Sequence, residues 1–133
     1  MNQQDFLLRE IQKISQVLIA LIDKVTGLGT QDLEKEINEI DNVLTLQFDF
    51  DISSLIKISN QDLLIKLNKL NENQLETFVE LVKKYNLIEN NKNIDARGLL
   101  SKGFFLINEL NSKSKDYSIH RTNLYKQLLI LDK

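Results

Sequence analysis

The amino-acid sequence predicts an all-α protein of about six helices in stacked antiparallel hairpins, with no significant sheet. Three observations predict this class. The 133 residues contain no proline and only four glycines, so few positions oppose helix formation. Apolar residues recur every three or four positions along most of the chain. Polar stretches that begin with helix-capping residues separate these periodic segments, and the chain length suits one domain over residues 1–133.

The first helix is expected from about Gln4 to Thr26, and it should end at Gly27, which readily adopts the left-handed conformation that closes a helix. Its main apolar residues are separated by 4, 3, 4, 3 and 4 positions and form one stripe. Further apolar residues widen this stripe, which favours a helix packed on a globular core, with a dimer seam as the alternative. The candidate interaction or core stripe is Leu7, Ile11, Ile14, Leu18, Leu21 and Val25.

The same segment does not fit an export signal or a membrane anchor. Charged residues are spread over positions 5–13, and the longest continuous apolar run, residues 17–22, is far shorter than the roughly 20 residues of a spanning helix. We therefore expect no membrane span. The absence of cysteine suits a reducing compartment, so a cytoplasmic location is expected.

A second helix is expected from the N-cap Thr30 to about Leu46, antiparallel to the first. These two helices would form an N-terminal hairpin over residues 1–47, with the two apolar stripes facing each other. The stretch "LQFDFDIS" (46–53) alternates like a strand, but a single strand has no hydrogen-bonding partner. We interpret it as a linker with two buried phenylalanines, followed by a short helical turn from Asp51 to Lys57.

The rest of the chain predicts further helices over residues 48–133. Ser59 and Asn71 each begin a capping pattern, so a leucine-rich helix should follow Ser59 and another helix should follow Asn71. The next helix is expected from about Ile94 to Asn111. Ser118 is expected to cap a last helix that runs through Leu131.

Three segments together resemble an uncharacterised family of small bacterial all-helical proteins. They are "DFLLREIQKISQVLIALIDKVTGL", "ISNQDLLIKLNKL" and "GLLSKGFFLINEL". Members of that family have an N-terminal amphipathic hairpin followed by degenerate tetratricopeptide-like hairpins. The resemblance implies this fold and a scaffold-like role, and it supplies no active residues. The tryptophan and the closing proline of the tetratricopeptide signature are missing here.

Few residues are candidates for catalysis. Asp49 and Asp51 are interpreted as solvated or capping carboxylates, because aspartate is favoured at helix caps. His120 is the only histidine, and we interpret it as a surface or capping residue. Without cysteine, a transition-metal site would depend on one imidazole and carboxylates. We therefore predict no catalytic, cofactor or metal site, with an unrecognised enzyme that uses these three residues as an alternative.

Charge is segregated along the sequence. Residues 31–51 contain seven acidic residues and one basic residue, a net charge of −6, and the candidate acidic face is Asp32, Glu34, Glu36, Glu39 and Asp41. Residues 97–133 contain seven basic and three acidic residues, a net charge of +4, and the candidate basic end is Arg97, Lys102, Lys113, Lys115, Arg121 and Lys126. Such segregation can orient a partner, although solvated helix faces give the same pattern.

These features favour a non-catalytic protein–protein interaction or scaffold module. The expected partner is another protein or a second copy in a homodimer, bound through a helical groove or through the first-helix stripe. An alternative is an acidic regulator that binds a basic partner through residues 31–51. The net charge of −2 and the isoelectric point near 5.4 argue against nucleic-acid binding.

Overall fold

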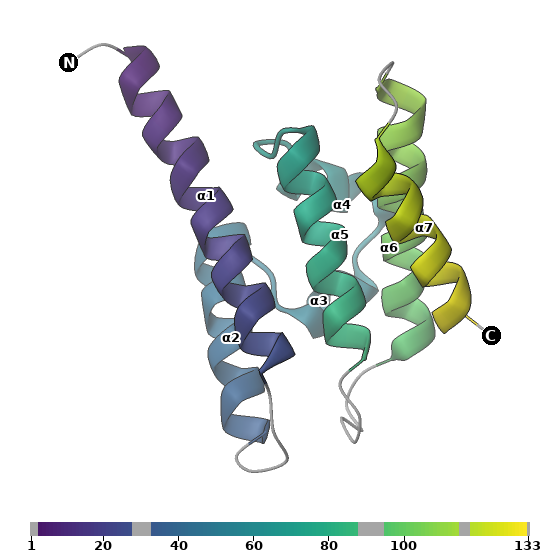
Figure 1. Ribbon diagram of the computed structural model, residues 1–133. Helices are drawn as coiled ribbons and strands as arrows, with labels where there is room; N and C mark the ends of the chain where they lie inside the picture. Colours follow the sequence, from purple (N-terminus) through teal and green to yellow (C-terminus); the bar gives the residue numbers. More distant parts are fainter. Residues whose placement is uncertain (1–2, 28–32, 88–94, 115–117, 133) are drawn as a thin grey trace.

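The computed structural model describes residues 3–27, 33–87, 95–114 and 118–132, and the side chains of residues 3, 4, 6, 7, 33 and 34 lie outside this description. Seven helices and no strand are found in this part of the chain, so the predicted all-α class is confirmed. Their bounds are close to those expected from the sequence. The helices are α1 (Gln3–Thr26), α2 (Leu33–Phe48), α3 (Ile52–Lys57), α4 (Asn60–Lys66), α5 (Glu72–Asn86), α6 (Ala96–Lys113) and α7 (Ile119–Leu131), as shown in Figure 1.

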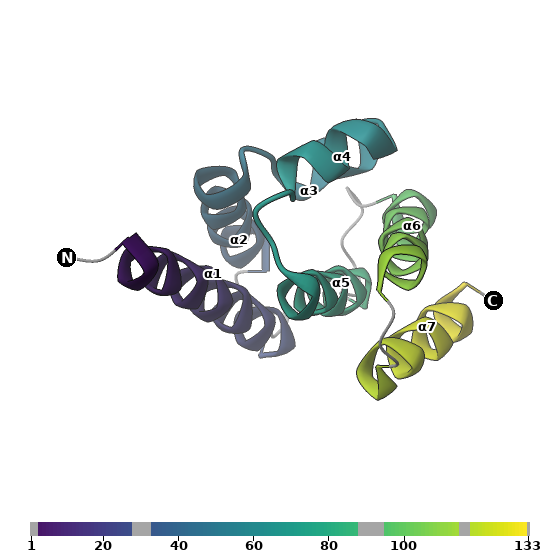
Figure 2. The same cartoon turned by 90° about the horizontal axis from the view of Figure 1, so that it is seen from above.

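Helix α5 is the central element of the fold. It contacts α1, α6 and α7, and Figure 2 shows it between α1 and α6. The predicted cap at Asn71 starts this helix, because the Asn71 side chain accepts a hydrogen bond of 2.8 Å from the Gln74 amide. The Gln74 side chain in turn accepts one of 3.1 Å from the Asn71 amide. This reciprocal capping box satisfies two amides that the first helical turn leaves without partners.

Helix α1 packs chiefly on α5, whereas the sequence predicted that its stripe would face α2. It contacts α5 far more extensively than it contacts α2. Leu18 and Leu21 of α1 are buried, and so are Ile40 and Leu44 of α2. The apolar face of α1 is therefore wide enough to cover two neighbours, and the spacing of one helix cannot reveal which neighbour covers more of it.

The two phenylalanines that the sequence predicted to be buried lie at the end of α2: Phe48 is the last residue of the helix, and Phe50 lies in the linker, which is shorter than expected. The rings of Phe48 and Phe50 stack with centroids 5.9 Å apart, and the ring of Phe78 from α5 meets them edge-on at 5.6 and 6.1 Å. Asp49 ends α2 with a φ of 64°, a left-handed conformation that aspartate adopts more readily than most residues. These rings connect α2 to the central helix.

The short helices and the last helix cover opposite sides of the α5–α6 pair. Figure 2 shows α3 and α4 on one side of this pair and α7 on the other. Helix α3 begins at the Asp51 cap, whose carboxylate accepts a hydrogen bond of 2.8 Å from the Ser54 amide. Helix α4 begins at the predicted Ser59 cap and has only seven residues. Because α4 is so short, it covers only part of the surface between α5 and α6.

Candidate interaction surfaces

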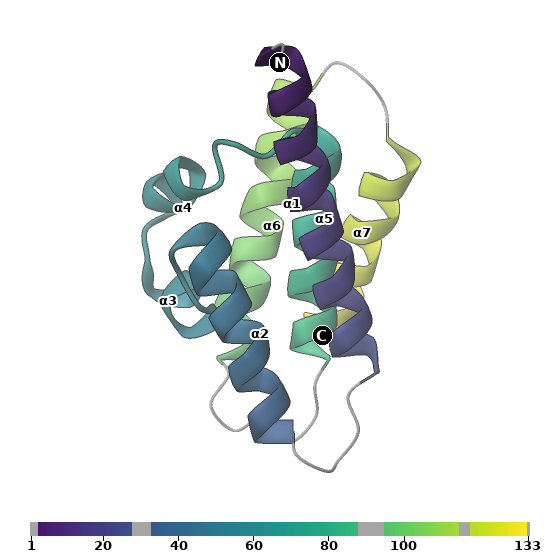
Figure 3. The ribbon, with the colours of Figure 1, turned by 90° about the vertical axis from the view of Figure 1, so that its left-hand side faces the viewer.

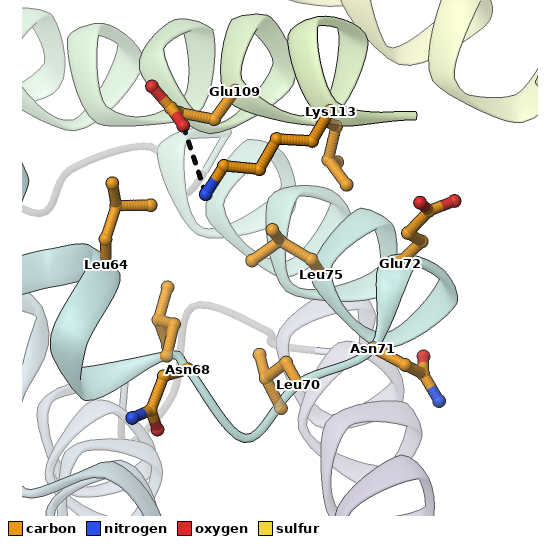
Figure 4. A pocket seen from close by; sticks show the side chains of 10 residues that line it. Leu64, Asn68, Leu70, Asn71, Glu72, Leu75, Glu109 and Lys113 are labelled. Atoms are coloured by element: carbon orange, nitrogen blue, oxygen red, sulfur yellow. Dashed lines mark ion pairs between the residues drawn. The ribbon is translucent and has the colours of Figure 1, made fainter. Parts of the chain in front are cut away.

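A groove of about 290 Å³ lies where α4, α5 and α6 meet. Figure 4 shows this groove with Leu64, Leu70 and Leu75 around it. Its apolar lining is Leu64, Leu67, Leu70, Leu75 and Leu110, and its polar lining is Asn68, Asn71, Glu72, Glu109 and Lys113. We call this site the leucine groove. An apolar lining with a few polar groups is typical of sites that bind other molecules.

The groove follows from the way α4 ends. Leu67 is the C-cap of α4, and the chain then turns within a few residues to the Asn71 cap of α5. Leu67 and Leu110 are buried, but Leu64, Leu70 and Leu75 are only partly buried. Covering such apolar surface stabilises a complex by roughly 25 cal/mol for each Å² removed from water. The sequence predicted a leucine-rich helix after Ser59, and no spacing pattern marked its leucines as lining a groove.

One ion pair lies on the polar side of the groove. Lys113 Nζ is 3.5 Å from the Glu109 carboxylate, and the Lys113 side chain is 71% exposed. Glu72 is also exposed, and its carboxylate accepts a hydrogen bond from the Ser114 hydroxyl at 3.1 Å. An ion pair like that of Lys113 and Glu109 contributes only about 0–1 kcal/mol to stability, so each of the two charges can pair with a group of a ligand instead.

The first-helix stripe divides into a buried part and an exposed part. Ile14, Leu18, Leu21 and Val25 are buried, whereas Ile11 is 38% exposed. Leu7 lies outside the described side chains. The stripe is therefore core at its last four positions, where α5 and α2 cover it, and partly exposed at Ile11.

The predicted acidic face is largely engaged within the chain. Lys24 of α1 pairs with Glu36 at 3.3 Å and with Glu39 at 2.5 Å. These contacts raise the pKa of Lys24 and lower the pKa of Glu39. The carboxylate of Asp41 accepts a hydrogen bond of 3.3 Å from the Ile52 amide, and partial burial raises the pKa of Asp41. The carboxylates of Glu36, Glu39 and Asp41 are thus engaged within the chain, whereas an acidic regulator would need them for its partner. Asp32 and the side chain of Glu34 lie outside the described residues.

The predicted basic end is wrong as a surface feature at two of its positions. Lys102 and Arg121 are buried, at 8% and 5% exposure. Lys102 Nζ donates to the Ile58 carbonyl at 2.6 Å and to Asn60 Oδ1 at 2.8 Å, and burial lowers the pKa of its amine. Arg97 and Lys126 are exposed, while Lys113 belongs to the groove, and Lys115 lies outside the described residues. Long apolar stems let both buried residues bring their charged groups to interior acceptors.

A buried polar network joins α5 to α6 and α7. Arg121 Nε donates to the buried Glu76 carboxylate at 3.0 Å, and Arg121 Nη1 lies 3.4 Å from the Leu110 carbonyl. His120 Nδ1 is 3.2 Å from the other oxygen of Glu76. Glu76 was not among the functional residues that the sequence predicted. The sequence feature that could have indicated it is the four-residue spacing of Glu72, Glu76 and Glu80, which places these three glutamates on one face of α5.

The three candidate catalytic groups serve different structural contacts. Asp49 pairs with Lys66 at 3.3 Å, Asp51 caps α3, and His120 lies beside Glu76. Within the described ranges, no cluster of three or more histidine, cysteine, aspartate or glutamate side chains has a geometry that could hold a metal ion. None of the described helices combines the length and apolarity needed to cross a membrane.

Comparison of the chain with models of protein families, with curated proteins and with solved structures gave no match. The features of the molecule that bear on function are therefore the leucine groove and the charges around it.

Proposed function

We propose that this chain is a non-catalytic protein-interaction module that binds an apolar segment of a partner in the leucine groove. The observation that carries the proposal is the convergence of five leucines from α4, the following linker, α5 and α6 on one open site with a polar margin. Aliphatic anchors at helical spacing are the usual energy source when a helix binds in a groove. The groove volume of about 290 Å³ suits a few aliphatic side chains better than a large ligand.

The charged residues support this proposal indirectly. Asp49, Asp51 and His120 each take part in a contact that stabilises the fold, as do Lys102 and Arg121. A catalytic role for any of these side chains would compete with the contact that it makes within the fold. Helices α5, α6 and α7 follow one another up and down in Figure 1, which supports the tetratricopeptide-like stacking that the resemblance implies.

A synthetic amphipathic peptide tests the proposal, with leucines spaced three and four residues apart and lysine and glutamate on its other face. In the leucine-methyl-labelled protein, we expect the peptide to shift the NMR signals of Leu64, Leu67 and Leu75. The methyl signals of Leu99, which is fully buried and does not line the groove, serve as the internal control. Shifts restricted to Leu129 on α7, or no shift at saturating peptide, would contradict the proposal.

A matched pair of variants on α4 makes the test specific. Leu64→Lys places a charge at the groove and should weaken peptide binding by roughly tenfold or more, because truncated or charged anchors lose most of their burial. Ile65→Lys changes the neighbouring residue, which is 66% exposed and does not line the groove, and should leave binding unchanged. Equal weakening by both variants would show that α4 acts only through overall charge.

A further inference from the structure

We infer that His120 is a pH-sensitive switch that strengthens the docking of α7 on α5 when its imidazole ring is protonated. The protonated ring links α7 to both Glu76 and Glu80 of α5, and the neutral ring can donate to only one of them. His120 is the only histidine of the chain, so a single side chain carries the effect. This role does not depend on what the leucine groove binds.

The His120 ring lies between two carboxylates of α5. His120 Nδ1 is 3.2 Å from Glu76 Oε2, and His120 Nε2 is 3.9 Å from Glu80 Oε2. The side chains of Glu76 and Glu80 are 6% and 20% exposed, whereas that of His120 is 52% exposed. The two carboxylates are thus held mostly away from water, while the ring can exchange a proton with the solvent.

The neutral ring of His120 cannot satisfy both carboxylates. A neutral imidazole carries a hydrogen on only one of its two nitrogens, so the other nitrogen presents a lone pair to a carboxylate oxygen. The imidazolium carries a hydrogen on both nitrogens, so it can donate to Glu76 and pair with Glu80 at the same time. The two contacts are therefore made together only when the ring is charged.

Three carboxylates of α5 face two permanent cations around this ring. The carboxylates are those of Glu72, Glu76 and Glu80. Arg121 of α7 lies 3.0 Å from Glu76 and 3.9 Å from Glu72. Lys83 of α5 lies 3.0 Å from Glu80. Among these described side chains, one negative charge is unbalanced while the ring is neutral, and the imidazolium supplies the missing positive charge.

Helix α6 also packs on α7, and it contributes uncharged oxygens beside these side chains. They are the Leu110 carbonyl and Asn111 Oδ1, which lie 3.4 and 3.3 Å from the guanidinium of α7. Glu109 and Lys113 of α6 pair with each other at 3.5 Å. Asp116, which precedes α7, lies outside the described residues. The described residues at this end of α6 therefore add no net charge next to the ring.

Helix α7 is placed where a change in a few contacts can alter its docking. Figures 2 and 3 show α7 at the edge of the molecule, on the side of α5 and α6 away from α3 and α4. Leu124 and Leu128 bury one face of α7, whereas Ile119 and Ile130 are exposed. A helix at an edge opens with less free energy than the whole fold needs to unfold, so polar contacts can decide how often it opens.

The link should stabilise the fold at mildly acidic pH and be lost at alkaline pH. Imidazole side chains change charge between about pH 5 and pH 8. The folded chain holds two carboxylates beside the imidazolium, and the unfolded chain does not hold them in place. The stability that the link contributes is therefore present at the acidic end of this range and disappears as the pH rises and the ring loses its proton.

Urea denaturation of the full chain at about pH 6 and about pH 8.5 tests this role. His120→Gln keeps a side chain that can donate a hydrogen bond, but this side chain cannot become charged. We expect it to lower the folding equilibrium constant roughly fivefold at the lower pH, as is typical of a half-exposed ion pair, and to match the wild type at the higher pH. Asn123→Gln, at an exposed position of α7, is the matched control and should resemble the wild type at both pH values.

A double-mutant cycle tests the contact with the second carboxylate. In a Glu80→Gln background, His120→Gln should cost clearly less stability at the lower pH, because the ring then has only one carboxylate beside it. An equal cost in both backgrounds would show that Glu80 takes no part and would overturn the link to two carboxylates.

Leucine-methyl NMR locates the effect on α7. Between the two pH values, the signals of Leu124 and Leu128 should shift in the wild type and shift much less in His120→Gln, with the fully buried Leu18 of α1 as the internal control. An equal loss of stability by His120→Gln at both pH values would mean that the ring acts through packing, and it would overturn the switch. Unchanged stability of this variant at the lower pH would overturn it as well.

Discussion

The buried charges of Lys102 and Arg121 are positioned by specific hydrogen-bond acceptors. The Lys102 amine donates to two neutral oxygens, the Ile58 carbonyl and Asn60 Oδ1. These hydrogen bonds offset only part of the cost of burying the charged amine, so burial lowers the pKa of Lys102. Arg121 instead meets the carboxylate of Glu76 at 3.0 Å. At the scale of one residue, the sequence showed only that these positions were charged. Their burial depends on acceptors contributed by other helices.

Two glycines of α6 should respond in opposite ways to replacement by alanine. A Cβ at Gly98 would lie 2.6 Å from Ile56 Cγ2 and 2.6 Å from an Asp95 carboxylate oxygen, so Gly98→Ala should destabilise the fold by about 1–3 kcal/mol. A Cβ at Gly103 would have its nearest contact at 3.4 Å, with Leu128. Gly103→Ala should therefore be neutral or stabilise by up to about 1 kcal/mol through helix propensity. Urea denaturation of both variants measures the difference, and the same sign for both would contradict this interpretation.

Helix α7 is held by a buried ion pair as well as by apolar packing. Its apolar residues are spread around the helix: Leu124 and Leu128 are buried, whereas Ile119 and Ile130 are 68% and 67% exposed. A helix without one clear apolar face has no strongly preferred orientation from hydrophobic burial alone. The contact between Arg121 and Glu76 supplies a directional constraint, because the guanidinium and carboxylate must meet in one geometry. The orientation of α7 on the rest of the fold is therefore determined mainly by the polar contact between Arg121 and Glu76.

Removing one partner of this pair should be more harmful than removing both. Arg121→Met leaves the Glu76 carboxylate buried without its guanidinium partner, and we expect a loss of about 3–5 kcal/mol in the free energy of unfolding. The double variant Glu76→Leu with Arg121→Met should recover a large part of that loss, because neither charge of the buried pair remains. Guanidinium denaturation of the two single variants and the double variant completes the cycle. Additive losses would show that the two side chains act independently.

A matched control separates burial from general sensitivity to charge removal. Glu109→Gln removes the carboxylate of the exposed pair with Lys113 and should cost less than about 1 kcal/mol. A comparable loss in this variant and in Arg121→Met would mean that burial does not determine the cost.

At the scale of the whole molecule, α1 stabilises the fold through one face and presents a different part of its surface to solvent. The stripe positions Ile14, Leu18, Leu21 and Val25 are buried, whereas Leu8 and Ile11 are 56% and 38% exposed. Of the two roles that the sequence allows for this stripe, core or dimer seam, the buried positions belong to the core. The division occurs near the hydrogen bonds from Gln74 to α1.

Charge introduced at adjacent positions of α1 tests this division. Leu18 is fully buried, so Leu18→Asp should unfold the protein or reduce its stability by more than about 4 kcal/mol. Ile19 is 55% exposed, and Ile19→Asp should change stability by no more than about 0.5 kcal/mol. Thermal denaturation followed by circular dichroism measures both. A folded Leu18→Asp protein with unchanged stability would show that α1 is not part of the core.

The sequence by itself determined most of the helices, several of their caps and the buried faces of most of them; the predicted cap Thr30 lies outside the described residues, and the Asp95 cap of α6 was not predicted. Ser59, Asn71 and Ser118 cap their helices as predicted, and Phe48 and Phe50 are buried as predicted. These properties are local, because capping and apolar periodicity depend on residues within a few positions of each other.

Only the tertiary structure decided which helices pack together and which charges are buried. The choice of α5 as the main neighbour of α1, the Arg121–Glu76 pair and the leucine groove all join segments far apart in the chain. An apolar stripe specifies that a face will be covered, but the hydrophobic effect is non-directional and does not specify the partner. Packing among all the helices selects that partner, and it also leaves the uncovered leucines that form the candidate interaction site.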